Sequence, residues 1–362
     1  MWVDPETADD ASTVEEKSNM TSTIAELHRV ITHLDDDGGE RISARTQPGP
    51  TIRRDRPPLG RIRIIAASDG VRLSVRDYGS RASDHTVVLL HGLCLDQTSW
   101  DIQIGQLIRQ WGNDIRIISY DHRGHGDSAD APMHTYRIEQ LADDLATLLI
   151  ALRVKGPLTL AGHSMGGMTA LAYLARSASH RPVEPNSLVL VATAAGKLAN
   201  RGLGRLLATP AAKILHALVR HTPHSVADEI ARALTRPLWP ALTRCAGYAA
   251  GSGALAAVSA ASINATPLPT KVGFLPSLRN YDQYHTLGSI SAATTVIAGG
   301  ADKLTPPAHA HDLAAGIPRA TLVHEPGAGH MLLHEAADLV TDTISRALTR
   351  SAEPRTPQDV PA

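Results

Sequence analysis

The strongest constraint on the fold comes from six short apolar segments. Helix-forming sequence follows several of them. Their apolar residues run on without polar alternation, which is typical of strands buried on both faces of a parallel sheet. The segments are 86–92, 115–128, 157–164, 187–195, 293–300 and 320–330. Helical sequence follows over about 136–152, directly after residue 164, and over about 331–349. This alternation predicts an open, mostly parallel α/β sheet flanked by helices.

The alternation also predicts the domain organisation. Two β-rich runs joined at Asp69-Gly70 predict a hairpin that begins near residue 61. Ala/Leu/Arg-rich helical sequence interrupts the pattern over 197–285. We therefore expect a core of residues 61–196 and 286–350, a helical lid over 197–285, and a disordered tail at 351–362.

The first 60 residues differ from the core. Residues 1–40 hold eleven Asp/Glu against two Lys/Arg, and residues 41–60 are rich in Pro, Gly and Arg. We expect a mostly disordered acidic arm and a linker, with one short amphipathic helix. Its apolar face is formed by Met20, Ile24, Leu27, Ile31 and Leu34. That helix is interpreted as docked on the core or on a neighbouring chain, or as a regulatory element.

The overall composition excludes several classes of protein. The 362 residues carry a net charge of −1, which gives no field to attract nucleic acid. The two cysteines, Cys94 and Cys245, are too few for a disulfide framework. An acidic N-terminus and the lack of a long apolar run are unlike a secretory signal or a transmembrane helix, so a cytoplasmic location is expected.

Chemically reactive residues recur where the predicted strands end. They are His91-Gly92, the segment from Asp121 to Ser128, Ser164, Asp302 and His330. In open α/β sheets, ligands bind beyond the carboxyl ends of the strands. The sequence therefore predicts one site at this edge of the sheet.

Residues Gly162 to Gly166 match the pattern G-x-S-x-G, with a predicted strand before and a helix after. A serine hydroxyl is a weak nucleophile and must be presented to a base on a tight turn. The helix that follows directs its N–H groups and positive dipole end towards the site. We expect Ser164 to be a nucleophile. The alternative is a tight connection needed only for packing.

Such a serine needs a base and an acid that orients the base. His330 follows the last predicted strand and Asp302 follows the strand before it. We expect Ser164, Asp302 and His330 to form a catalytic triad. The alternatives are a turn or cap role for Asp302 and an ordinary loop role for His330. His334 is a competing histidine, and Glu325 is the fallback acid.

A tetrahedral oxyanion needs two N–H donors. Met165, directly after the serine, is expected to supply one, and Leu93, in the loop after the first long strand, the other. Cys94 beside this loop is interpreted as a buried bystander.

Five ordered motifs together resemble the α/β-hydrolase superfamily over about residues 61–350, in its serine esterase and lipase-like branch. They are LLHGLCLDQTSW (89–100), YDHRGHGDS (120–128), GHSMGG (162–167), AGGADKLTPP (298–307) and PGAGHMLLHE (326–335). The resemblance implies an α/β-hydrolase fold with a helical lid insertion. It also implies that His122, His125 and His163 are framework residues.

Departures from related families narrow the expected activity. Haloalkane dehalogenases and epoxide hydrolases carry aspartate where this chain has Ser164. Leu93-Cys94-Leu95 differs from the oxyanion loops of His-Gly-Gly-Gly lipases, of C–C hydrolases and of perhydrolases. We therefore expect a carboxylic ester hydrolase (EC 3.1.1) that acts through an acyl-enzyme on Ser164. We expect this reaction to need no metal and no cofactor. Acyl transfer, perhydrolysis, C–C hydrolysis or slow-turnover ligand binding on the same residues remain alternatives.

The predicted lid is basic, with ten Lys/Arg against three Asp/Glu over 197–285. Such a lid could attract acidic substrates or a membrane surface, or pair with the acidic arm. Its apolar helical runs suit a pocket wall, or ordinary core packing. We expect a small-molecule ester with an apolar acyl chain as substrate and no nucleic-acid partner. Acyl length, leaving group and oligomeric state stay open.

Overall fold

The computed structural model describes residues 60–220, 262–263 and 265–352. The predicted acidic arm with its amphipathic helix therefore lies outside the described residues, as do most of the linker and part of the lid. The last helix continues to Ala352, two residues into the predicted tail, and the rest of that tail is also outside.

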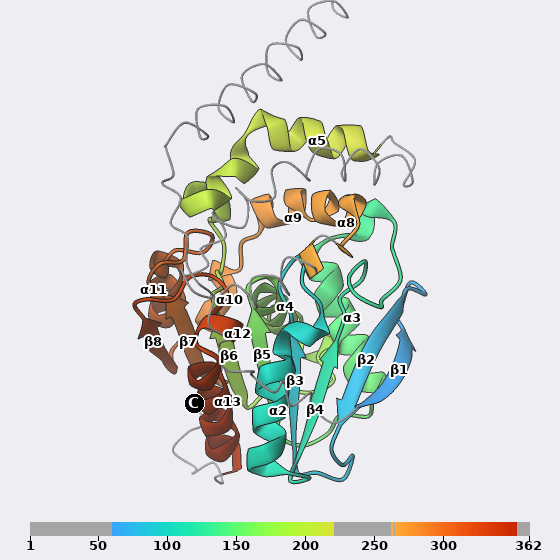
Figure 1. Ribbon diagram of the computed structural model, residues 1–362, viewed down its shortest axis with the longest axis vertical. Coiled ribbons are helices and arrows are strands. Elements are labelled where there is room, and N and C mark those ends of the chain that lie inside the picture. Colours follow the sequence, from blue (N-terminus) through green and yellow to red (C-terminus); the bar gives the residue numbers. More distant parts are fainter. Residues whose placement is uncertain (1–59, 221–261, 264, 353–362) are drawn as a thin grey trace, which may run out of the picture. The chain divides into compact units, whose positions relative to one another are not determined.

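One sheet of eight strands forms the centre of the described chain (Figure 1). The strands are β1 (Arg61–Ala66), β2 (Arg72–Tyr78), β3 (His85–Leu90), β4 (Ile115–Tyr120), β5 (Leu158–His163), β6 (Ser187–Val191), β7 (Ala293–Gly299) and β8 (Ala320–Glu325). Their order is β1-β2-β4-β3-β5-β6-β7-β8. The six strands β4, β3, β5, β6, β7 and β8 pair in parallel. Strand β2 is antiparallel to both of its neighbours, β1 and β4. The predicted hairpin and the mostly parallel sheet are confirmed.

The central strands are buried on both faces, which explains their uninterrupted apolar sequence. Every residue of β3, β4, β5 and β6 is buried. Successive side chains point to opposite faces of a strand. In β3, Val88 and Leu90 accordingly belong to one hydrophobic core, and Val87 and Leu89 belong to the other.

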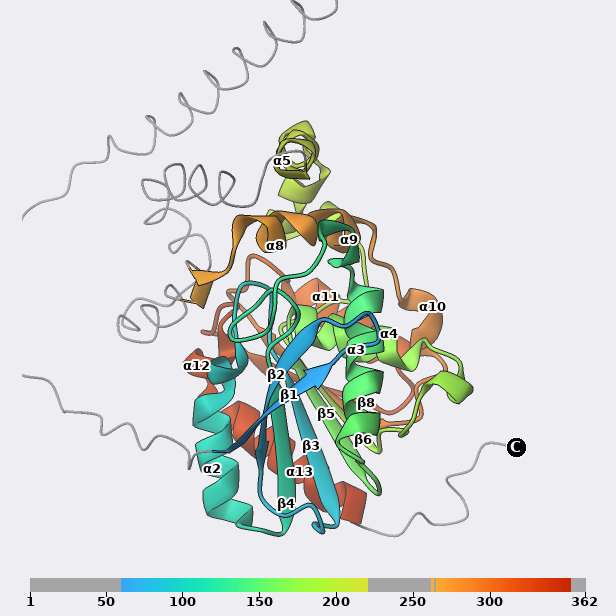
Figure 2. The same cartoon turned by 90° about the vertical axis from the view of Figure 1, so that its right-hand side faces the viewer.

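Helices complete these two cores. On one face lie α3 (Ile138–Ala151), α4 (Met165–Leu174) and α11 (Pro307–Gly316), and on the other lie α2 (Asp101–Trp111) and α13 (Ala337–Ala352) (Figure 2). The prediction of a single final helix over 331–349 is wrong, because the structure has two helices there. The structure divides it at Ala336 into α12 (Leu332–Glu335) and α13, because α12 is one short turn whose Glu335 side chain reaches back to the preceding loop.

The insertion between β6 and β7 is helical where the structure describes it. It contains η4 (Leu198–Asn200), η5 (Gly202–Ala208), α5 (Pro210–Arg220), α8 (Leu268–Gly273), α9 (Leu275–Asn280) and α10 (Tyr284–Leu287). Figures 1 and 2 show α8 and α9 beyond one end of the sheet and α5 on their outer side. None of the described helices combines the length and the apolar character needed to cross a bilayer.

Candidate active site

Ser164 occupies the sharp turn between β5 and α4. Its backbone has φ 51° and ψ −117°, in the positive-φ region that side-chain-bearing residues rarely adopt. Hydrogen bonds from both sides of the turn hold this conformation. Ser164 N–H donates to the Val191 carbonyl at 2.9 Å, and the Ser164 carbonyl accepts from Gly167 N–H at 3.0 Å and from the Thr193 hydroxyl at 2.7 Å. The turn is therefore fastened to the end of β6.

The glycines on either side of Ser164 let the helix approach the sheet. A Cβ atom on Gly166 would lie 2.1 Å from the Leu90 carbonyl oxygen, and one on Gly162 would lie 2.5 Å from the Gly166 backbone. Both distances are well inside van der Waals contact. The glycines thus serve packing, and the same close approach exposes the serine at the strand end.

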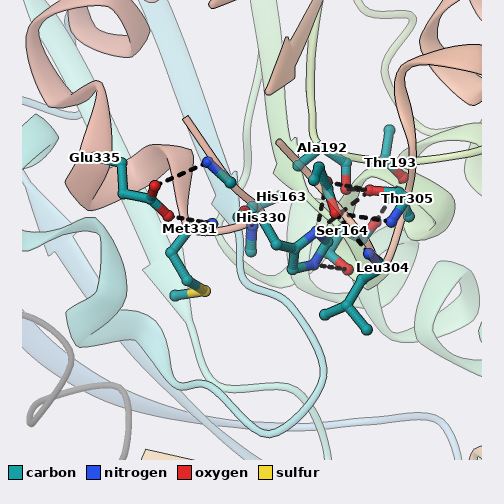
Figure 3. A network of polar contacts seen from close by, with 11 residues as sticks. His163, Ser164, Ala192, Thr193, Leu304, Thr305, His330, Met331 and Glu335 are labelled. Atoms are coloured by element: carbon teal, nitrogen blue, oxygen red, sulfur yellow. Dashed lines mark hydrogen bonds and ion pairs between the residues drawn. The ribbon is translucent and has the colours of Figure 1, made fainter. Parts of the chain in front are cut away.

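The structure brings the three predicted residues into one hydrogen-bonded chain, of which Figure 3 labels Ser164 and His330. His330 Nε2 lies 3.1 Å from Ser164 Oγ, and His330 Nδ1 lies 2.8 Å from Asp302 Oδ2. Asp302 and His330 are both buried, and each follows the carboxyl end of its strand, β7 or β8. These distances allow a proton to pass from Ser164 to His330 while Asp302 fixes the imidazole tautomer.

Asp302 is held in its ionised form by the groups around it. Its Oδ1 accepts hydrogen bonds from the N–H groups of Leu304 at 2.8 Å and Thr305 at 2.9 Å. The Thr305 hydroxyl lies 2.7 Å from Oδ2 and 2.9 Å from the Ala192 carbonyl oxygen. Burial by itself raises the pKa of Asp302, but the facing His330 and the hydrogen bonds from Thr305 outweigh it and leave the pKa below its usual value.

Two further side chains fix the loop that carries His330. His163 Nε2 donates to the His330 carbonyl at 2.9 Å, and burial lowers the pKa of His163 to about 3, so this imidazole is neutral. Glu335 accepts from Gly329 N–H at 2.8 Å and from Met331 N–H at 3.2 Å (Figure 3). His163 therefore has the framework position predicted for it.

The two competitors considered in the sequence are not the groups joined to Ser164. The imidazole that reaches the Ser164 hydroxyl is that of His330, and the carboxylate that reaches this imidazole is that of Asp302. His334 lies on α12, the short turn after the His330 loop. Glu325 ends β8, where its backbone carbonyl accepts a hydrogen bond from Gly300.

The loop after β3, which contains Leu93, is held by buried histidines. His91 Nε2 accepts from His122 N–H at 2.9 Å, and its Nδ1 lies 2.8 Å from the Gly92 carbonyl oxygen. His125 Nε2 accepts from Cys94 N–H at 3.1 Å. Burial lowers the pKa of His91 to about 4 and that of His125 to about 3, which keeps both rings neutral and able to accept.

Met165, the second predicted oxyanion donor, is the first residue of α4, so its N–H has no acceptor within the helix. Leu93 lies in the turn closed by the hydrogen bond from Leu95 N–H to the Gly92 carbonyl. Burial raises the pKa of the Cys94 thiol to about 11, which keeps it protonated. The protonated state agrees with the interpretation of Cys94 as a bystander, although its side chain is half-buried and not buried as predicted.

Three residues of this network were missed in the sequence: Thr193, Thr305 and Glu335. Thr305 comes three residues after Asp302, and Glu335 five after His330, but nothing in either spacing distinguishes a triad contact from an ordinary turn or cap. Thr193 follows β6 and offers no motif. Within the described ranges, no group of three or more His, Cys, Asp or Glu side chains could hold a metal ion.

Comparisons with known proteins identify the fold family. The model of the alpha/beta hydrolase fold family matches residues 85–337. AB hydrolase superfamily protein YisY of Bacillus subtilis is 26% identical over 290 residues, which cover 78% of this chain and 97% of that protein. The solved structure of a thermophilic esterase from Thermogutta terrifontis matches with a TM-score of 0.64 and 26% identity, over 81% of this chain and 100% of that chain. A non-heme chloroperoxidase from Streptomyces lividans is 34% identical over 113 residues, or 31% of this chain and 39% of that protein.

Proposed function

Because this chain belongs to the α/β-hydrolase family, we propose that it is a serine hydrolase that cleaves carboxylic esters. The observation that carries the proposal is the hydrogen-bonded chain from Ser164 through His330 to Asp302. The similarity to a thermophilic esterase over most of both chains supports the choice of an ester as substrate.

The first half of the reaction forms an acyl-enzyme. As Ser164 Oγ attacks the ester carbonyl carbon, its proton moves to His330 Nε2, 3.1 Å away in the resting site. The ionised Asp302, 2.8 Å from Nδ1, stabilises the imidazolium that forms. The tetrahedral intermediate then collapses, and His330 returns the proton to the departing alcohol.

The second half releases the acid. Water replaces the alcohol, gives a proton to His330 and attacks the acyl carbon, and Ser164 leaves with that proton. In both halves the developing oxyanion is bound by the N–H groups of Leu93 and Met165. The position of Met165 at the first turn of α4 supports this assignment, because that N–H and the helix dipole both favour negative charge.

Perhydrolysis is a second candidate, favoured by the similarity to the bifunctional esterase/perhydrolase DCH of Acinetobacter calcoaceticus, which is 32% identical over 113 residues, or 31% of this chain and 38% of that protein. Hydrogen peroxide in place of water would attack the same acyl-enzyme and release a peracid. The two reactions share Ser164, His330 and Asp302, so they differ only in the nucleophile that enters in the second half.

A panel of p-nitrophenyl esters from acetate to palmitate tests the proposal. We expect hydrolysis by the wild type, a dependence on acyl length, and loss of activity by about 10³-fold or more in Ser164→Ala. Ser179→Ala, at an exposed serine away from the network, is the matched control and should keep wild-type rates. Equal activity of Ser164→Ala and wild type would refute the serine mechanism. Faster release of peracid than of acid in the presence of peroxide would favour the second candidate.

A further inference from the structure

Exposed apolar side chains gather on the outer part of the helical insertion. Of the seven large hydrophobic side chains that are exposed in the described residues, four belong to η5 and α5. They are Leu206, 63% exposed, Ile214, 51%, Leu215, 38%, and Leu218, 59%. Scattered single apolar residues need no explanation, but a cluster of this kind marks an interaction surface.

The α5 helix presents this apolar face outward. Val219 is buried and packs with Val272 of α8, which fixes the inner side of the helix. Ile214 and Leu218 are four residues apart and therefore share one face of the helix. Both are exposed, and α5 lies on the side of α8 and α9 that faces away from the sheet (Figures 1 and 2). The helix thus has apolar side chains on its outer surface, where a helix that only covers a core would have polar ones.

The charge around this apolar face is positive. Residues 197–220 contain five Lys/Arg and no Asp/Glu. Arg201 pairs with Asp312 at 2.8 Å, the Lys197 ammonium lies 4.2 Å from the centre of the Tyr284 ring, and Arg205 Nε donates to the Asn200 carbonyl at 3.2 Å.

Three of the five cations border the exposed apolar residues. Arg205, Lys213 and Arg220 are exposed, and no carboxylate of the described residues forms a salt bridge with them. Lys213 and Arg220 flank Ile214 and Leu218 on the same helix. Their positive charge thus lies at the surface, beside the exposed apolar side chains.

We propose that this surface docks on anionic lipid bilayers. The α5 surface is defined here as Arg205, Leu206, Lys213, Ile214, Leu218 and Arg220. An amphipathic helix that alternates aliphatic side chains with cations fits the boundary between acyl chains and headgroups. Anionic headgroups attract Lys and Arg, and the acyl chains accept Ile and Leu. The absence of acidic side chains from residues 197–220 removes the repulsion that would oppose such a contact.

The location of the insertion relates this surface to the candidate active site. The insertion leaves the sheet after β6 and returns at β7, and the ends of these strands carry Thr193 and Asp302, which both belong to the Ser164 network. A bilayer on the α5 surface would bring lipid to the same end of the molecule. The proposal goes beyond ester hydrolysis, since docking needs no chemistry at Ser164.

Vesicle co-sedimentation of the full chain tests the proposal. Phosphatidylcholine vesicles with and without phosphatidylglycerol, both ether-linked, provide surfaces that an esterase cannot degrade. We expect binding to the anionic vesicles that weakens as salt is added, and at least tenfold weaker binding to the neutral ones. Equal binding to both vesicle types, or no binding to either, would overturn the proposal.

Variants locate the contact. The double variant Lys213→Ser, Arg220→Ser should weaken binding to anionic vesicles about 25-fold. Each cation near an anionic surface contributes about fivefold to the binding constant, and the two factors multiply. Ile214→Ser with Leu218→Ser should weaken it at least tenfold. The matched controls are Ile150→Ser, at a side chain that is 63% exposed on α3, and Lys155→Ser, at an exposed lysine. Wild-type binding by the α5 variants, or equal losses in the controls, would place the contact elsewhere.

The result can be read independently of the proposed enzyme activity. Melting temperature shows whether each variant is folded, whatever its activity. Turnover of a short water-soluble p-nitrophenyl ester should be the same in all four variants, because none of them alters the Ser164 network. Failure of ester hydrolysis would leave the binding measurement intact, and failure of binding would leave the ester measurement intact.

Discussion

The carboxylate of Asp302 is the most completely held group of the candidate active site. Four donors surround its two oxygens: the N–H groups of Leu304 and Thr305, the Thr305 hydroxyl, and His330 Nδ1. A buried carboxylate with this many donors stays ionised and cannot rotate. The imidazole of His330 is therefore oriented before any substrate binds.

Substitution of Asp302 tests whether this carboxylate orients the His330 imidazole. In Asp302→Asn the side-chain amide can no longer accept from His330 Nδ1–H in the same way, so the imidazole loses its tautomer and its charge stabilisation. We expect kcat to fall by about 10³- to 10⁴-fold with little change in KM, measured on the preferred p-nitrophenyl ester.

Glu325→Gln is the comparison for this experiment, because Glu325 is the other acid near the end of the last strands. Its rate should stay within about twofold of the wild type. A large loss in Glu325→Gln, with Asp302→Asn nearly unaffected, would show that the wrong acid had been assigned.

The sequence predicted the three residues of the triad. It did not predict the residues whose hydrogen bonds hold the triad in place. Ser164, Asp302 and His330 could be found because each follows an apolar strand and each has a reactive side chain. Thr193, Thr305 and Glu335 could not, since a threonine or glutamate in a loop has many ordinary roles. Their contacts depend on how distant loops meet, which no local spacing records.

At the scale of an element, the strand–turn–helix unit around Ser164 depends on close backbone contact. Gly166→Ala should destabilise the protein by about 2–3 kcal/mol or more, because its Cβ would meet the Leu90 carbonyl oxygen at 2.1 Å. The same shift would displace the serine turn and lower kcat. Urea denaturation and ester turnover measure the two effects.

Gly288→Ala is the matched control for this variant. No atom lies within 4 Å of the Cβ position at Gly288, and that glycine has no positive φ. Its stability should be unchanged or slightly raised, because alanine reduces the entropy of the unfolded chain. Similar losses in both variants would mean that steric contact at the serine turn is not the cause.

Elements differed in how well their sequences predicted them. The central strands were found because burial on both faces leaves uninterrupted apolar runs. The α2 and α11 helices were overlooked, and α12 and α13 were merged, because only one side of each surface helix is apolar and the signal is weaker. The break at Ala336 comes from Glu335 binding backbone groups of the His330 loop, a tertiary contact.

The whole molecule contains an unusual set of buried histidines. Among the described residues, burial lowers the pKa of five histidines to about 3 or 4, namely His85, His91, His125, His163 and His309, and it also lowers the pKa of His122 well below its usual value. Above the unfolded pKa of about 6.5 these residues are neutral in both states and leave stability unaffected. As pH falls from 6.5 towards 4, the unfolded chain binds protons that the folded chain cannot, so the folded state loses stability.

Two buried acids, Asp121 and Asp144, have the opposite effect on stability, because burial raises their pKa values. Burial raises the pKa of Asp121 to about 6, so the folded state binds this proton more tightly and gains stability as pH falls from 6 to 4. Asp144 acts in the same direction, so these two acids offset only part of the effect of the histidines. The free energy of unfolding should therefore decrease as the pH falls from about 6 towards 4, because the lowered histidine pKa values outnumber the raised carboxyl ones.

His85→Asn tests this account of acid stability. His85 Nε2 lies 3.0 Å from Thr159 Oγ1 at the start of β3, apart from the Ser164 network. Removing this histidine should reduce the dependence of unfolding free energy on pH by about 1.4 kcal/mol per pH unit between pH 6 and 5. Urea denaturation at several pH values measures the slope, and pH 8 provides the reference. An unchanged slope would contradict the role assigned to buried histidines.

The most direct test of the central claim is to find which residue a fluorophosphonate modifies in the folded wild-type protein. Such a reagent reacts with a serine only when a base activates it, so peptide mapping by mass spectrometry identifies the nucleophile without knowledge of the substrate. We predict one adduct per chain, on the peptide that contains Ser164, and much slower labelling in Asp302→Asn. Stoichiometric labelling at another residue, or none on the folded protein, would contradict the proposed serine mechanism.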